Sequence, residues 1–213
     1  MVGKALKVEC FGKSDVGLVR EENEDSFICK EEIGLYMVAD GMGGHVGGKM
    51  ASNLTVETFA DLIERNFKHL SASVGVEPME SSSVPRLLSD AVQDVCYCVY
   101  DKSVERPELS GMGTTLTALF VSGGYGYLAQ VGDSRCYLLR GHKLIQVTDD
   151  HSLVNEQVKA GLITESQAKV SRLRNIITRS VGFEKDVSVD IFTLPLLVGD
   201  RLFLCSDGLS NVV

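Results

Sequence analysis

Two Asp-Gly pairs, Asp40-Gly41 and Asp207-Gly208, each follow an apolar run that is typical of a β-strand. A strand end fixes the direction of its side chain, and the glycine lets the chain turn away and leaves the carboxylate bare. If the fold brought the two acids together, they would form an oxygen-rich site of the kind that binds Mg²⁺ or Mn²⁺. Asp-Gly is also a common turn dipeptide, so the flanking residues must decide between the two interpretations.

The first elements that could position these acids can be predicted from the spacing of apolar residues. Residues 25–29 and 34–39 are separated by a polar turn, and they predict a β-hairpin that leads into Asp40. Apolar residues at helical spacing follow from Lys49 and again over 84–104, and they predict two amphipathic helices.

The second half of the chain returns to strands. Short strands joined by glycine turns cover 114–147, helical signals interrupt them over 151–179, and further strands are expected at 186–192 and 201–205. Within the interruption, Thr164 begins a capping-box pattern that predicts a short helix. This order favours helices on the faces of antiparallel sheets, and no linker divides the chain into domains.

The composition is that of a globular protein, with 213 residues, 44% hydrophobic and 23% charged. The net charge of −8 excludes nucleic acid as an expected partner, and it would repel a phosphorylated substrate unless a local cation reversed it. No apolar run approaches the ~18 residues of a membrane span, and the N-terminus has no signal-peptide core. None of the six cysteines belongs to a C-x-x-C pair, as expected for free thiols of a cytoplasmic protein.

Seven short motifs occur in order along the chain, and they lie at 14–25, 36–45, 111–116, 131–135, 148–154, 177–182 and 201–208. In this order and at these spacings, the chain from Gly12 onward resembles the bacterial branch of the metal-dependent protein phosphatase 2C (PPM-type) family. A single piece such as Gly-Asp-Ser-Arg would be weak support, whereas seven in sequence are specific.

The resemblance implies an α+β fold, a four-layer αββα sandwich of two antiparallel β-sheets flanked by helix pairs. It implies hydrolysis of phosphoserine and phosphothreonine by a water held between metal ions, with two or three Mn²⁺ or Mg²⁺ ions in the site. The expected partner is a phosphorylated protein, in opposition to a Ser/Thr kinase, and the expected state is a monomer. Residues 151–179 correspond to the family's flap, which would meet the phosphoprotein; a plain surface helix is the alternative.

The resemblance also implies a set of metal ligands. Asp40 would bridge two ions, with the carbonyl of Gly41 as a further ligand. Asp207 would hold one of the pair, and Asp133 would hold a third, more weakly bound ion.

Four further residues have two interpretations each. Asp25 and Glu24 would bind metal, Glu24 through water, or else they form a solvated turn. Arg20 matches the family's phosphate-binding arginine, whose planar fork fits two phosphate oxygens, or else it forms a surface salt bridge with a neighbouring glutamate. His45 would act as general acid or orient a water, or else it has a structural role in its loop.

Family members continue past the Ser-Asp-Gly-Leu motif with a further helix and a final strand, whose Asp binds the same metal as Asp40 and Asp207. The sequence stops at Val213, so we expect a C-terminally truncated chain in which 1–213 is a single phosphatase domain without that helix and strand. The alternative function is a catalytically weak or inactive phosphoprotein-binding module.

Overall fold

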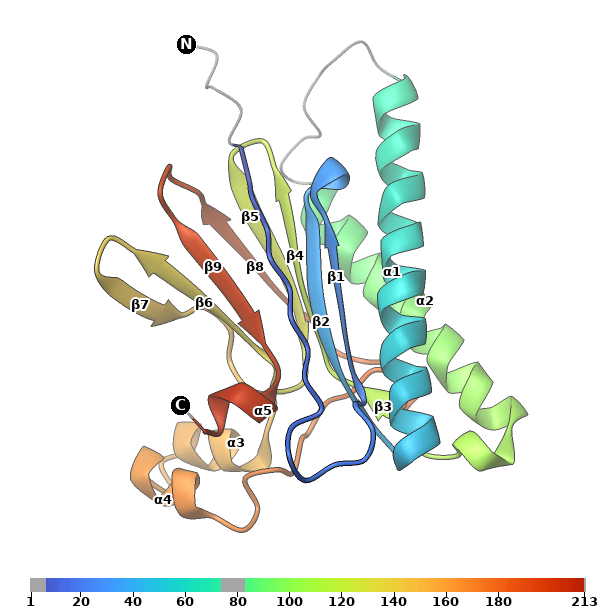
Figure 1. Ribbon diagram of the computed structural model, residues 1–213, viewed down its shortest axis with the longest axis vertical. Helices are drawn as coiled ribbons and strands as arrows, with labels where there is room; N and C mark the ends of the chain where they lie inside the picture. The colour runs from blue at the N-terminus through green and yellow to red at the C-terminus, as the bar shows by residue number, and fades with distance from the viewer. Residues whose placement is uncertain (1–6, 74–82, 213) are drawn as a thin grey trace.

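A β-hairpin is the first regular structure in the computed structural model, which describes residues 7–73 and 83–212 (Figure 1). Strand β1 (Asp25–Lys30) pairs antiparallel with β2 (Leu35–Met42) through the 3₁₀ turn η1 (Glu31–Ile33). The turn ends on Gly34, where φ is +69° and an added Cβ would lie 2.6 Å from the carbonyl oxygen of Val121. Only glycine fits such a position, so Gly34 fixes the hairpin that the sequence predicts.

The hairpin continues into a six-stranded antiparallel sheet, in which β1 is one edge and β8 the other. The strand order is β1-β2-β4-β5-β8, and β3 pairs with the end of β2. The added strands are β3 (Gly113–Thr114), β4 (Leu116–Ser122), β5 (Tyr125–Val131) and β8 (Asp190–Pro195). Strands β4 and β5 are buried along most of their length, as expected at the centre of a sheet covered on both faces.

Two long helices cover one face of this sheet, as Figure 1 shows. They are α1 (His45–Ser73) and α2 (Ser83–Glu105), which confirms the two predicted amphipathic helices. Their buried side chains form the main core with every second residue of β2; examples are Phe59, Ile63, Leu88, Val92, Leu35 and Met37.

A second, three-stranded antiparallel sheet packs on the other face and has the order β7-β6-β9. Its strands are β6 (Arg135–Arg140), β7 (Lys143–Gln146) and β9 (Arg201–Cys205). A smaller core joins the two sheets around Tyr36, Leu119, Leu128 and Cys136. The predicted α+β fold with two antiparallel sheets is therefore confirmed.

The short helices lie together at one end of the molecule (Figure 1). They are α3 (Leu153–Lys159), α4 (Glu165–Val170) and α5 (Asp207–Ser210), and η2 (Pro107–Leu109) follows α2. The capping box of Thr164 and Gln167 at the start of α4 is present as predicted. In the described residues both long helices lie on the large sheet, and no helix of comparable length covers the small sheet. No described helix is long and apolar enough to cross a membrane.

Candidate metal and phosphate site

The hairpin register places Asp25 directly opposite Asp40, so their side chains point to the same face of the sheet. Burial and the charges of Asp25, Asp207 and Asp133 raise the pKa of Asp40 to about 9. Four acids from four separate segments therefore lie near enough for their charges to act on one another. A cation is what would balance their mutual repulsion.

Asp207 and Asp133 reach this acidic cluster from distant parts of the chain. Asp207 is the first residue of α5, and the amide of Asn211 donates to its Oδ2 at 3.1 Å. The preceding Ser206 donates to Oδ2 of Asp25 at 2.8 Å, which ties the end of β9 to the hairpin. Asp133 lies in the turn between β5 and β6, where burial and the charge of Asp207 raise its pKa to about 6.

The structure corrects the expected strand ends. Strand β2 continues past Asp40 to Met42, because β3 pairs with its last two residues. Gly41 allows a close approach instead of a turn, since an added Cβ would lie 2.0 Å from the carbonyl oxygen of Gly48 in α1. At the second pair, β9 ends at Cys205 as predicted, and Asp207 begins α5 after Ser206.

Two threonines of the motif at 111–116, to which the sequence analysis assigned no role of their own, hold the backbone of Asp40. The Asp40 N–H donates to Oγ1 of Thr115, and the hydroxyl of Thr114 donates to the Asp40 carbonyl, both at 2.9 Å. Oγ1 of Thr115 also lies 2.8 Å from Oγ of Ser134, the neighbour of Asp133. Two polar residues at the head of a buried strand are the signal that could have identified them.

Glu24 precedes Asp25 and has one buried oxygen without a partner. Its Oε1 accepts no hydrogen bond from any described residue, whereas its Oε2 lies 3.4 Å from Nη1 of Arg20. A buried carboxylate oxygen without a donor is costly unless a cation or a water meets it. Arg20 forms the ion pair that its alternative interpretation expects, but its side chain is 64% exposed and can reach other anions.

The donors at this place suit a hard divalent cation, because every side chain of the cluster offers oxygen. In the described part of the chain, no three acidic, thiol or imidazole groups converge closely enough to chelate an ion as they stand. The buried, unpartnered Oε1 of Glu24 also fits a nearby cation or its water.

His45 begins α1, directly after Gly44, which has a positive φ of 78°. The side chain of His45 lies outside the described part of the structure, so its role stays a prediction.

The base of the flap, residues 151–179, is anchored on the turn that carries Asp133. The His151 N–H donates to the carbonyl of Gly132 at 3.0 Å, and the Gly132 N–H donates to Nδ1 of His151 at 3.1 Å. Because Nδ1 accepts, the ring proton is on Nε2, which lies 3.1 Å from Oδ2 of Asp190. Burial lowers the pKa of His151, so a neutral imidazole makes this anchor.

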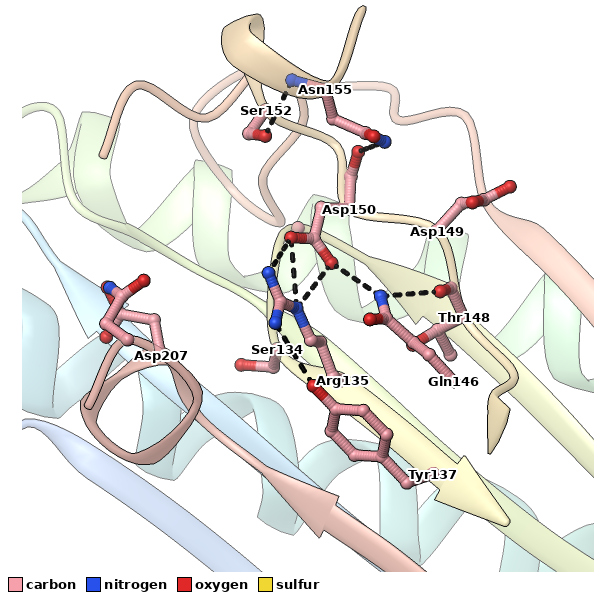
Figure 2. A network of polar contacts seen from close by, with 12 residues as sticks. Ser134, Arg135, Tyr137, Gln146, Thr148, Asp149, Asp150, Ser152, Asn155 and Asp207 are labelled. Carbon is pink, nitrogen blue, oxygen red and sulfur yellow. Dashed lines mark hydrogen bonds and ion pairs between the residues drawn. The ribbon is translucent and has the colours of Figure 1, made fainter. Parts of the chain in front are cut away.

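A second anchor joins the start of β6 to the segment before α3, as Figure 2 shows. The guanidinium of Arg135 donates to both carboxylate oxygens of Asp150, at 2.8 Å and 2.5 Å, and to the hydroxyl of Tyr137 at 3.1 Å. The carbonyl of Asp150 accepts from the side-chain amide of Asn155 in α3 at 2.7 Å. These contacts fix the flap relative to Asp133.

Comparison with known proteins identifies relatives over almost the whole chain. The family model described as protein phosphatase 2C matches residues 19–213. A "Serine/threonine phosphatase stp" of Listeria monocytogenes serotype 4b is 39% identical over 204 residues, which cover 94% of this chain and 77% of the relative. The solved structure of the Mycobacterium tuberculosis phosphatase PstP/Ppp is 36% identical, with a TM-score of 0.81 over 94% of this chain and 79% of that one. The PstP catalytic domain in complex with two manganese ions has a TM-score of 0.78 at 36% identity, over 94% and 78% of the two chains.

Proposed function

The chain belongs to the protein phosphatase 2C family, and we infer from this membership and from the acidic cluster that it removes phosphate from serine and threonine residues of proteins. It is a metal-dependent serine/threonine protein phosphatase with Mn²⁺ or Mg²⁺ as its cofactor. The observation that carries the chemistry is the group of four acids that includes Asp40. Burial and the charges of the other three raise the pKa of Asp40 to about 9. No relative and no contact described above favours an inactive binding module.

We propose that the cluster holds the metal ions. Asp40 and Asp207 would bind the principal ions together with the carbonyl of Gly41. Asp133 would serve a third ion, and Asp25 would complete the set. Bound ions would polarise phosphoryl oxygens and lower the pKa of an attacking water toward neutrality.

Arg20 is the proposed phosphate ligand. Its guanidinium lies beside Glu24 and is mostly exposed, so an arriving phosphate could replace that carboxylate as its ion-pair partner. An arginine fork forms two charge-assisted hydrogen bonds with a phosphate, which would hold the substrate with its phosphorus near the cluster. Glu24 would then act as the resting partner of Arg20, and its buried Oε1 would meet metal-held water.

His45 is the proposed proton donor to the leaving serine or threonine oxygen. It begins α1 close behind Gly41 in sequence, and histidine is the usual general acid near neutral pH. The alternative is a structural role for His45 in its loop. A rate profile that keeps its acidic-to-neutral limb in His45→Gln would favour that alternative.

The physiological setting is also a proposal. A phosphoprotein phosphatase acts against a Ser/Thr kinase, and we place this one in the cytoplasm as a monomer of a single domain. Six free cysteines support a reducing compartment. Size-exclusion chromatography with light scattering tests the monomer.

Hydrolysis of p-nitrophenyl phosphate tests the activity. We expect turnover with Mn²⁺ or Mg²⁺, none with chelator, and none in Asp40→Asn, because an amide carries no charge to hold a cation. Asp94→Asn, an exposed position on α2, is the matched control and should keep full turnover. Retained turnover in Asp40→Asn at saturating Mn²⁺ would refute the assignment.

A further inference from the structure

The flap has the opposite charge to the rest of the molecule. Residues 151–179 contain five basic and two acidic residues, a net charge of +3. The whole chain carries −8, so the remainder carries −11. A segment of reversed sign on an acidic protein is where an anionic ligand can approach.

The positive charge of the flap is concentrated on one short strip, residues 169–176. Three basic residues, Lys169, Arg172 and Arg174, alternate there with apolar ones, and all three are exposed. The apolar side chains are exposed as well: Val170 is 81%, Leu173 is 42% and Ile176 is 45% exposed. Single exposed apolar residues are ordinary, but a run of three between unshielded cations has the composition of a contact surface.

The basic side chains of the strip differ from nearby ones in having no acidic partner. Around the site the cations are paired, as in Arg135–Asp150, Lys159–Asp149 and Arg179–Asp190. Among the described residues, no carboxylate pairs with Lys169, Arg172 or Arg174. Their charge is therefore available to a ligand.

The C-terminal end of the strip is anchored on α3, at the same end of the molecule as the acidic cluster. The Ile176 N–H donates to the carbonyl of Leu173 at 3.1 Å, and the Ile176 carbonyl accepts from Leu153 of α3 at 2.9 Å. The next residue, Ile177, pairs with Ser152, adjacent to the His151 anchor on the Asp133 turn. Figure 1 shows α4 at the same end of the molecule as α5 and the loop before β1, which carry Asp207 and Arg20.

We propose that the strip 169–176 binds an acidic segment that flanks the phosphorylated residue of the protein substrate. The proposal rests on the phosphatase function above and specifies its substrate class. A substrate with its phosphate at the cluster would extend over the neighbouring strip, where carboxylates or further phosphates meet the three cations. The apolar side chains between them would contact apolar residues of the same segment.

Two phosphothreonine peptides test this proposal, one flanked on both sides by Glu and one by Lys. The net charge of the protein favours the Lys peptide, whereas the strip favours the Glu peptide, so the two explanations predict opposite preferences. We expect a higher kcat/KM for the Glu peptide, and a preference that shrinks with added salt. In the triple variant Lys169→Glu, Arg172→Glu, Arg174→Glu, the ratio of the two kcat/KM values should fall roughly tenfold or more, because each exposed charge contact is worth up to about a factor of five.

The control is a triple variant with the same change in net charge on other elements, namely Arg65→Glu, Arg86→Glu and Lys143→Glu. These side chains are exposed on α1, α2 and β7, and the ratio should stay within about twofold of its original value, since distant charges are screened. Because the readout is a ratio within one protein, a general loss of activity cancels. An equal fall of the ratio in both triple variants would overturn the proposal, as would a preference of the unmodified protein for the Lys peptide.

Binding of the same peptides, measured by calorimetry without turnover, separates this proposal from the phosphatase function. Tighter binding of the Glu peptide that the strip variant loses supports the strip even if p-nitrophenyl phosphate is not hydrolysed. Equal binding of both peptides refutes the strip even if hydrolysis is normal. Stronger binding to phosphatidylserine vesicles than to the Glu peptide would also overturn it and reassign the strip to a membrane surface.

Discussion

Replacing Asp40 by Asn should stabilise the metal-free protein, although it removes the activity. Burial and the charges of Asp25, Asp207 and Asp133 raise the pKa of Asp40 from 3.8 to about 9 on folding. Near pH 7 the unfolded chain has this carboxylate ionised, whereas the folded chain must take up a proton, and this uptake opposes folding. The cost is absent below pH 3.8, grows as the pH rises, and levels off above about pH 9.

The magnitude follows from the distance between pH 7 and the unfolded pKa. About 3 pKa units lie between them, and each is worth ~1.4 kcal/mol, which gives roughly 4 kcal/mol. Any folded pKa well above 7 gives the same result at that pH. Asn has the shape of the protonated acid and needs no proton, so it should recover this free energy. For a chain of about 200 residues this corresponds to a rise in Tm of roughly 10 °C.

Urea unfolding with chelator at pH 7 and pH 5 measures the effect. The gain in free energy of unfolding from Asp40→Asn should shrink to roughly 1.5 kcal/mol at pH 5, because that pH lies only about one unit above the pKa of the unfolded acid. The control Asp94→Asn should stay within about 0.5 kcal/mol of the unmodified protein at both pH values. If Asp40→Asn is no more stable at pH 7, or if its gain does not depend on pH, the four carboxylates do not meet as described. In saturating Mn²⁺ the unmodified protein should become more stable than Asp40→Asn, because a metal ion stabilises only a folded state that binds it.

Three further substitutions probe the site. Arg20→Ala should raise KM for p-nitrophenyl phosphate about tenfold to a hundredfold, since a hydrogen bond to a charged group is worth roughly 1.5–3 kcal/mol; unchanged kinetics would leave Arg20 as a surface ion-pair partner. Asp133→Ala should lose turnover, most clearly at low metal, without a fall in Tm; an unfolded or fully active variant would make Asp133 a plain turn residue. Gly41→Ala should lower the free energy of unfolding by roughly 1–3 kcal/mol, because its Cβ would meet the carbonyl oxygen of Gly48 at 2.0 Å. Gly208→Ala, whose Cβ would make only ordinary contacts, is the control, and equal effects of the two substitutions would contradict the steric argument.

The hairpin and the long helices could be predicted because their signals are local. Residues 25–29 and 34–39 alternate around a polar turn, and the structure pairs them as β1 and β2. The exact start of α1 was missed by four residues, because predicted periodicity begins at Lys49 whereas the helix begins at His45, after glycines of positive φ. Apolar spacing reports the buried face of a helix and says little about its first turn.

The site could be predicted as a set of residue types more readily than as a set of contacts. Gly41 looked like a turn residue, but the atom that demands glycine is the Gly48 carbonyl in another element. Likewise, the donation from Ser206 to Asp25 joins residues 181 apart, and no local rule indicates such a pair. Long-range packing decides both positions, so a single sequence carries no direct signal for them.

The span of that last hydrogen bond sets an order of events during synthesis. The β1–β2 hairpin, whose register places Asp25 opposite Asp40, leaves the ribosome early. Asp133 follows much later, and Asp207 is added only after β9, which must first pair with β6. A nascent chain therefore lacks one of the four acids until both sheets can assemble, so we expect phosphatase activity to appear only after synthesis has passed Asp207.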